Sequence, residues 1–204
     1  QILELTKTAS GSKLNGIIQA NTYNTRFIVD FGTQIDTLRT AINNEEIPAL
    51  NRNHPKSSSA FISITAADAS DLLHSYTLEA FPVSQSWTNG TGNYADKPET
   101  RTGVAWSTRT GFDSTNVQWD TGSAHSANTS AGLEIPQGGG TWITGSGYEA
   151  SQSFNYESID VRMDVSDIVE KWIEQDIRNY GFIVKLPYST ETTGNENFNL
   201  KFFS

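Results

Sequence analysis

Short hydrophobic segments separated by clusters of Gly, Asn, Ser and Thr run along most of the 204-residue chain. Within several of these segments apolar and polar residues alternate, which is the pattern of half-buried β-strands. We expect strands at residues 26–31, 60–64, 76–81, 117–119, 140–144, 153–156, 159–163, 181–186 and 198–203. Residues 66–73 are expected to form a helical turn or a wide loop. The pattern therefore predicts an all-β fold, either a sandwich or a barrel.

One short helix is predicted after the strand at 159–163. Four apolar residues recur at a spacing that puts them on one helical face: Ile168, Val169, Trp172 and Ile173. Asp164 or Ser166 can cap the N-terminus of this helix, because a short polar side chain there accepts a hydrogen bond from a free backbone N–H group. We expect the helix at about 166–175, followed by a turn and a further strand.

Two stretches of the chain, residues 43–59 and 86–147, are predicted to be long loops. The second is rich in Gly and Thr, yet it holds four of the five tryptophans: Trp87, Trp106, Trp119 and Trp142. Disordered segments are poor in aromatic residues. We therefore expect these loops to pack against the body of the domain.

Composition excludes several classes of function. The chain is polar, with a mean hydropathy of −0.45, and its formal net charge is −9, which argues against a nucleic-acid partner. The absence of cysteine excludes disulfides, thiolate metal sites and cysteine nucleophiles. No apolar stretch approaches the roughly 18 to 20 residues that span a membrane, so we expect no membrane partner.

The chain offers no set of residues with the spacing of a known catalytic, cofactor or metal site. His54, His74 and His125 lie far apart, and the sequence contains neither a nucleophile elbow nor a phosphate-binding loop. We therefore predict no catalytic, cofactor-binding or metal-binding residues. Aromatic side chains in the loops can instead contact a glycan or a protein partner: Trp87, Tyr94, Trp106, Trp119, Trp142 and Tyr148. Alternatively, they cover the edges of the fold, with each indole N–H bonded to a nearby carbonyl.

Residues 76–106 (YTLEAFPVSQSWTNGTGNYADKPETRTGVAW) resemble a pattern found in virion structural proteins of tailed bacteriophages. The resemblance continues through GGGTWITGSG at 138–147 and IDVRMDVSDIVEKWIEQDIRNYGFIVKL at 159–186. The same arrangement is similar to that of DNRLRE domains, which resemble carbohydrate-binding modules of bacterial surface proteins. The resemblance implies a jelly-roll-like β-sandwich with one short helix at an end.

The function that this resemblance implies is assembly and not catalysis. The chain is expected to be a decoration, fibre, collar or tail component located in the virion, which contacts other virion proteins and forms homo-oligomers. The alternative is a carbohydrate-binding module of an adhesin or bacterial surface protein. A glycan lyase or hydrolase is a third possibility, although no converging catalytic groups are evident in the sequence.

The ends of the sequence suggest a single domain, residues 1–204, that belongs to a longer polypeptide. The chain lacks an initiator Met and begins within an apolar-polar alternation at Ile2, Leu3 and Leu5. It stops at Ser204, directly after Lys201-Phe202-Phe203. Since the phage proteins that it resembles usually continue into another strand, we expect this sandwich to lack its last strand. Either that strand is missing from this sequence, or another chain fills its place at the open edge.

Overall fold

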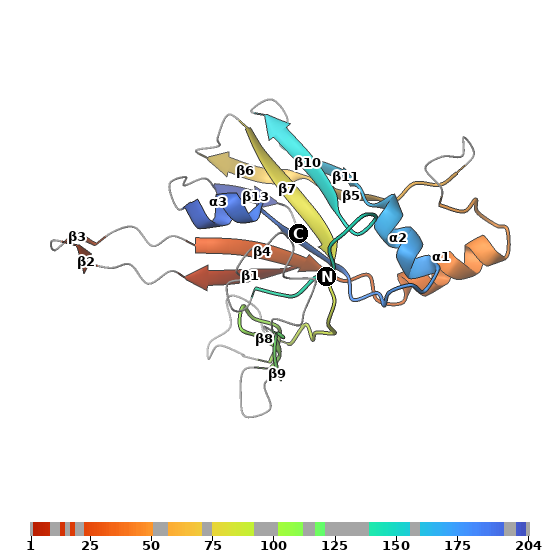
Figure 1. The fold of residues 1–204 in the computed structure, drawn as a ribbon, viewed down its shortest axis with the longest axis horizontal. Helices are drawn as coiled ribbons and strands as arrows, with labels where there is room; N and C mark the ends of the chain where they lie inside the picture. Colours follow the sequence, from red (N-terminus) through yellow and green to blue (C-terminus); the bar gives the residue numbers. More distant parts are fainter. Residues whose placement is uncertain are drawn as a thin grey trace.

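The computed structural model describes residues 2–8, 13–14, 17–18, 23–50, 57–70, 75–91, 102–111, 117–120, 139–155, 160–193 and 199–202. Over these residues the fold consists mainly of β-strands in antiparallel sheets, with three short helices (Figure 1). The predicted all-β class is thereby confirmed. His54, His74, His125 and Tyr94 lie outside the described residues.

A five-stranded antiparallel sheet forms the centre of the fold. Its strands lie in the order β1-β4-β12-β7-β10, namely β1 (Ile2–Thr8), β4 (Tyr23–Val29), β12 (Phe182–Lys185), β7 (Ser75–Pro82) and β10 (Ala150–Asn155). All four side chains of β12, the middle strand, are buried. A strand buried on both faces reads as a continuous apolar run in the sequence, which explains the segment Phe-Ile-Val before Lys185.

Eight further strands form four antiparallel pairs: β5 (Phe61–Ile64) with β11 (Val161–Asp164), β6 (Ala66–Ser70) with β13 (Asn199–Phe202), β2 (Lys13–Leu14) with β3 (Ile17–Ile18), and β8 (Thr108–Thr110) with β9 (Val117–Gln118). Buried and less buried side chains alternate along β5 and β11. This confirms that the period of two in these segments marks half-buried strands.

The central sheet has a hydrophobic core on each face. On one face, which we call the helix side, side chains of β7, β10 and β12 pack with β5, β11 and α2 (Ser166–Ile173). On the opposite face, the tryptophan side, Ile28, Phe81 and Ile183 pack with indole rings from the loops. Trp172 of α2 lies on the helix side, with its ring 4.6 Å from that of Phe182. The sheet is therefore an inner layer of the fold.

The predicted helix is confirmed as α2, which begins at Ser166, but its N-cap residue differs from the two that were expected. Val165 occupies the N-cap position and makes no side-chain capping bond. Asp164 Oδ1 accepts hydrogen bonds from the backbone N and the Oγ of Ser166, at 3.0 and 2.7 Å. Ser166 Oγ in turn accepts a bond from the backbone N of Ala60, at 3.0 Å, and so ties the helix to the residue that precedes β5.

The prediction of a single helix is wrong, because the structure also contains α1 (Gln34–Asn43) and α3 (Tyr188–Thr193). The helix α1 lies beside α2 (Figure 1), and Arg39 of α1 donates hydrogen bonds to the carbonyls of Trp172 and Ile173. The Thr-rich sequence of α1 hides its apolar face, of which Ile35 is the buried residue.

Two other expectations differ from the structure. Residues 66–70 form a strand, β6, instead of a turn or loop, because they continue β5 after one residue and pair with β13. Pairing between distant segments overrides the weak strand preference of an Ala-rich sequence. Residues 140–144 form no regular strand, and Trp142 makes only an isolated bridge to Val83. Gly139 and Gly140 have φ of 78° and 91°, values that interrupt an extended chain.

Candidate functional site

The register of the central sheet gathers charged side chains on its tryptophan side. Ile183 of β12 lies opposite Ile28 of β4 and Phe81 of β7, and Lys185 lies opposite Glu79. Since side chains along a strand alternate between faces, Arg26 shares this face with Ile28. Arg26, Lys185 and Glu79 thus lie among apolar side chains on this face. We call these three residues, together with Glu191 of α3, the charged cluster.

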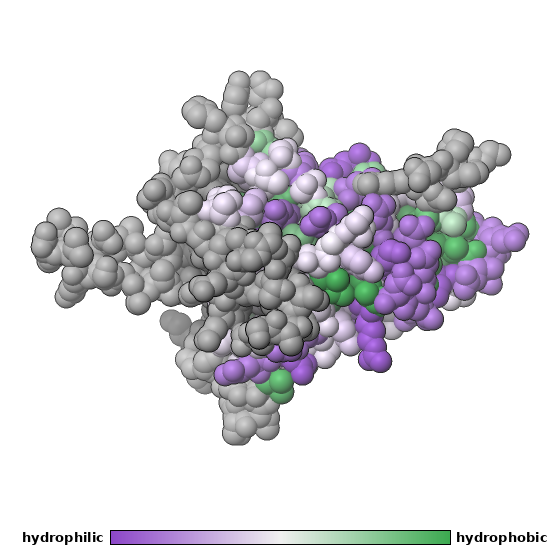
Figure 2. Space-filling view, in the orientation of Figure 1, coloured by the Kyte–Doolittle hydropathy of each residue, from purple (hydrophilic) through white to green (hydrophobic). Residues whose placement is uncertain are grey.

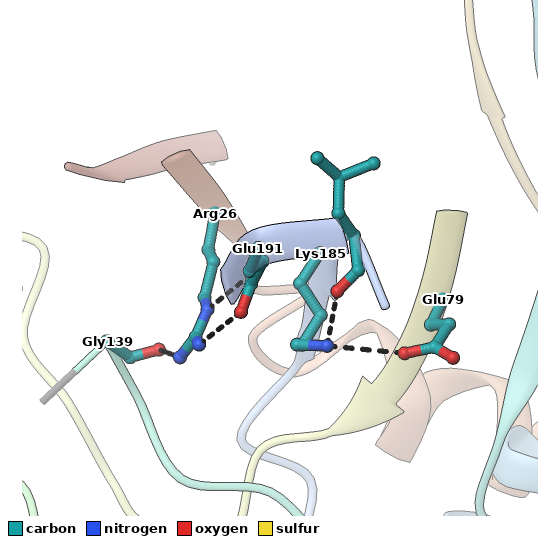
Figure 3. Close-up of polar contacts among 6 residues, drawn as sticks. Arg26, Glu79, Gly139, Lys185 and Glu191 are labelled. Carbon is teal, nitrogen blue, oxygen red and sulfur yellow. Dashed lines mark hydrogen bonds and ion pairs between the residues drawn. The ribbon is translucent and has the colours of Figure 1, made fainter. Parts of the chain in front are cut away.

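Arg26 is the most completely enclosed member of the charged cluster. Its side chain is 1% exposed and forms a bidentate ion pair with Glu191, in which Nε donates to Oε1 at 2.9 Å and Nη2 to Oε2 at 2.6 Å. Its Nη1 donates to the carbonyl of Gly139 at 2.9 Å (Figure 3). The planar guanidinium matches the two carboxylate oxygens, which makes this one of the stronger and more directional polar contacts available to a protein.

Indole rings enclose the same guanidinium. The Cζ atom of Arg26 lies 4.8 Å from the ring centroid of Trp106 and 5.2 Å from that of Trp142. A Cβ atom built on Gly139 would stand 2.5 Å from Arg26 Nη1 and 2.8 Å from the nearest atom of Trp106. Glycine is therefore needed at 139 for the backbone to approach the guanidinium. The aromatic rings add cation–π attraction and exclude water.

Lys185 forms the second half of the charged cluster. Its Nζ donates to Glu79 Oε2 at 3.2 Å and to the carbonyl of Leu186, and it lies 5.7 Å from the ring centroid of Trp142. Burial lowers the pKa of this ammonium below its usual value, because removal from water penalises the charged form. Glu191 and Glu79 act in the opposite direction, and the nearby Arg26 lowers the pKa further.

The four tryptophans predicted from the second long loop come together in the tryptophan-side core. Trp119 and Trp142 are buried, and Trp87 and Trp106 are partly buried. Trp87 Nε1 donates to the carbonyl of Tyr180 at 2.8 Å, and Trp119 Nε1 donates to that of Ala105 at 3.0 Å. These bonds match the alternative in which the rings fasten loops to the domain.

The remaining aromatic candidates are placed differently. Tyr148 is half-buried in the loop that follows Trp142, and its backbone N donates to Gly145 O at 3.0 Å. Trp106 is likewise only partly buried. Of the predicted contact residues that the structure describes, Trp87, Trp106 and Tyr148 therefore retain surface that a partner can touch.

The charged cluster was missed in the sequence, although a signal for it exists. Arg26 and Lys185 each stand inside an apolar run predicted to be a strand, Arg-Phe-Ile-Val and Phe-Ile-Val-Lys. A charge within a strand that is buried on both faces requires a partner, because an isolated buried ion is costly. Glu191, the partner of Arg26, lies 165 residues away in a polar segment of the sequence, and no local pattern there indicates the pairing.

In chemical terms the charged cluster binds a carboxylate. The guanidinium supplies two parallel donors, aromatic rings supply the walls, and the carboxylate of the chain's own α3 fills the position. Within the described ranges, no three His, Cys, Asp or Glu side chains are grouped closely enough to hold a metal ion. The helices that the structure describes include none that is long and apolar enough to cross a membrane.

Comparison with protein-family models, with curated proteins and with solved structures found no match for this chain.

Proposed function

We propose that this chain is a structural domain of a tailed-bacteriophage virion, with a jelly-roll-like β-sandwich fold. In this proposal it serves as a decoration, fibre, collar or tail component that contacts other virion proteins and further copies of itself, and it catalyses no reaction. The fold part of the proposal is supported by the helix-side core, in which the central sheet packs against β5 and β11. Packing of two sheets through one apolar core is the defining feature of a sandwich.

The observation that carries the proposal is that the residues on which the expected resemblance to phage proteins rests are used for packing. Val83, which lies between Pro82 and Ser84 in the segment 76–106, pairs with Trp142. Trp87 of the same segment donates a hydrogen bond to the carbonyl of Tyr180. Gly103 of the Gly-Val-x-Trp segment packs so closely that an added Cβ would lie 2.4 Å from Asn89 O. Motif residues that hold loops on a sheet suit a protein that works as a rigid building block.

The surface is compatible with polar contacts between subunits. Among the described residues, the large hydrophobic side chains that are exposed are Phe61 and Val117. Figure 2 shows mainly hydrophilic residues in the coloured part of one face, with hydrophobic ones in small areas. Interfaces outside obligate oligomers are about as polar as the rest of a protein surface, so this composition fits assembly from folded subunits.

The direct test is the location of the chain in particles. Phage particles from the source that encodes the chain are purified by density-gradient centrifugation, and the chain is quantified by mass spectrometry and located by immunogold electron microscopy. We expect a fixed copy number per particle and labelling at one defined position. Detection of the chain only in the unassembled fraction of the lysate would refute the proposal.

The second candidate function is glycan binding, which the partial exposure of Trp106 and Tyr148 favours. Aromatic faces of this kind can stack on the C–H faces of sugar rings. A glycan array is expected to show binding that Tyr148→Ala abolishes and Tyr148→Phe retains, since phenylalanine keeps the ring. Circular dichroism establishes that both variants are folded. No binding to any glycan on the array would refute this candidate.

A further inference from the structure

The structure shows an arm formed by α3 and β13, which follows the middle strand of the central sheet. It is joined to β12 through Leu186 and Pro187. Proline has no backbone N–H, and it restricts the residue before it to an extended conformation. The chain therefore leaves the sheet at a two-residue connection that favours an extended path. Figure 1 shows α3 beside β4, and β13 beside β6.

Among the contacts described for this arm, two join it to distant strands of the domain, and both are directional and polar. The first is the bidentate pair between Glu191 of α3 and Arg26 of β4. The second is the antiparallel ladder between β13 and β6, in which Asn199 lies opposite Ser70 and the register shifts at Lys201. Of the side chains that the structure describes in α3, Glu191 is the buried one.

The Arg26 site recognises its carboxylate strongly, but a buried ion pair adds little net stability because both charges lose water. The same contacts form whether the arm comes from the same chain or from a second copy, so exchange changes few interactions apart from the connection. Exchange of an identical element is a low-cost route to dimers. Its main cost is the lost freedom of association, which a high local concentration of copies reduces.

We propose that two copies of this chain exchange the arm, so that Glu191 of each copy occupies the Arg26 site of the other and β13 of each copy extends the other's β6. The interaction surface is thus the tryptophan-side face around Arg26 together with the free edge that β6 presents once its own β13 has left. This inference rests on the proposed function, because an assembling particle supplies the local concentration. It identifies the partner as a second copy and Glu191 as the residue that the partner contributes.

The test uses disulfides between chains, and the 204 residues of this chain contain no cysteine to interfere. Ser70→Cys and Asn199→Cys are made in separate chains, since these residues lie opposite each other in the ladder. The two variants are mixed at several concentrations and oxidised, and the linked peptides are identified by mass spectrometry. We expect a disulfide between residues 70 and 199 of different chains, in a yield that rises with protein concentration.

The double variant with both cysteines in one chain shows whether the geometry permits the bond. Ala69 and Leu200, the adjacent opposed pair, provide a second position. Because hydrogen-bonded and non-hydrogen-bonded pairs alternate along an antiparallel ladder, one of the two positions has the closer spacing that suits a disulfide. The proposal is overturned if the double variant forms links only within chains, or if the mixed single variants form links between chains only at 70–70 and 199–199.

A second measurement tests the role of the ion pair. Glu191→Gln is expected to speed the formation of the 70–199 link between chains several-fold, since the contact with Arg26 must open before exchange. Glu174→Gln, at an exposed position after α2, is the matched control and should leave the rate unchanged. An unchanged rate in the Glu191 variant would overturn the assignment of Glu191. Particles that contain the chain without exchanged arms would refute this inference alone, whereas absence from particles would refute the proposed function.

Discussion

Arg26→Met should be among the most destabilising single substitutions on the tryptophan side of the sheet. Methionine keeps an unbranched apolar stem of similar length and removes the guanidinium. Glu191, with its side chain 3% exposed, then remains buried without its bidentate partner, and Gly139 O loses its donor. The removal of one member of a buried pair costs about 3–5 kcal/mol, because an uncompensated charge remains. This is a large part of the roughly 5–15 kcal/mol that holds most domains folded.

The paired substitution separates the ion pair from the packing. Glu191→Met alone leaves the Arg26 charge without its carboxylate and should also cost about 3–5 kcal/mol. In the double variant neither charge is buried, and the remaining loss is mainly the unpaired Gly139 carbonyl, about 1–3 kcal/mol. The double variant is therefore expected to be more stable than either single variant.

Urea unfolding followed by tryptophan fluorescence measures these differences, since Trp106 and Trp142 flank Arg26. Arg162→Met is the matched control: Arg162 is exposed and lies 4.2 Å from the ring centroid of Phe61, so its loss should cost only about 0.5–1 kcal/mol. The reasoning is refuted if Arg26→Met costs no more than this control, or if the two single effects add in the double variant.

Three further predictions concern stability. Gly181→Ala should lower the free energy of unfolding in urea by about 2–6 kcal/mol, because φ at Gly181 is +83° and the new Cβ would lie 1.9 Å from Val29 O. Gly32→Ala is the control: φ is +52° but the surrounding space is open, so it should cost only about 1–2 kcal/mol. Equal costs for the two variants would contradict this prediction. Arg39→Ala should lower the free energy of unfolding by about 1–3 kcal/mol and weaken the helical circular dichroism signal, because the Arg39 guanidinium donates hydrogen bonds to two carbonyls at the end of α2. Unchanged stability and an unchanged helical signal would argue against that role. Because the pKa of Lys185 is lowered in the folded state, the unfolded chain binds more protons between that folded pKa and about 10.4, the usual value for lysine. The free energy of unfolding of the wild type, measured by urea titration relative to Lys185→Met, should therefore rise with pH across that window. A difference that stays constant with pH would contradict the burial of a charged Lys185.

Local patterns predicted the elements whose burial is regular. Apolar and polar residues alternate at 60–64 and 76–81, which contain β5 and most of β7, and one apolar face runs along residues 168–173 of α2. In each element the buried side chains recur with the period of the backbone, which is two residues in a strand and 3.6 in a helix. The strand at 66–70 was missed since it depends on β13, more than 120 residues away, and not on local preference. The glycine-rich segment at 140–144 has an apolar sequence but follows glycines with positive φ, which a hydrophobicity pattern does not register.

The candidate site was predicted less completely than the fold. The sequence indicated that the tryptophans of the long loop pack on the domain, and the hydrogen bonds of Trp87 and Trp119 agree with that interpretation. It did not indicate what Trp106 and Trp142 enclose. A guanidinium between them requires the register of β4, the position of the loop at Gly139 and the carboxylate of α3 all at once. Such a site arises from three distant segments and has no motif of its own.

The charged cluster also explains how one register is selected in a sheet that is buried on both faces. Because side chains alternate, a slip of one residue in β12 would turn Lys185 toward the helix side and Phe182 toward the tryptophan side. The helix-side core consists of apolar residues, so the displaced ammonium would lie without a carboxylate, at the cost of an unpaired buried charge. Apolar residues alone, such as Ile183 and Val184, would tolerate the slip. Buried ion pairs that contribute little to stability can therefore still exclude the alternative pairings of β4, β12 and β7.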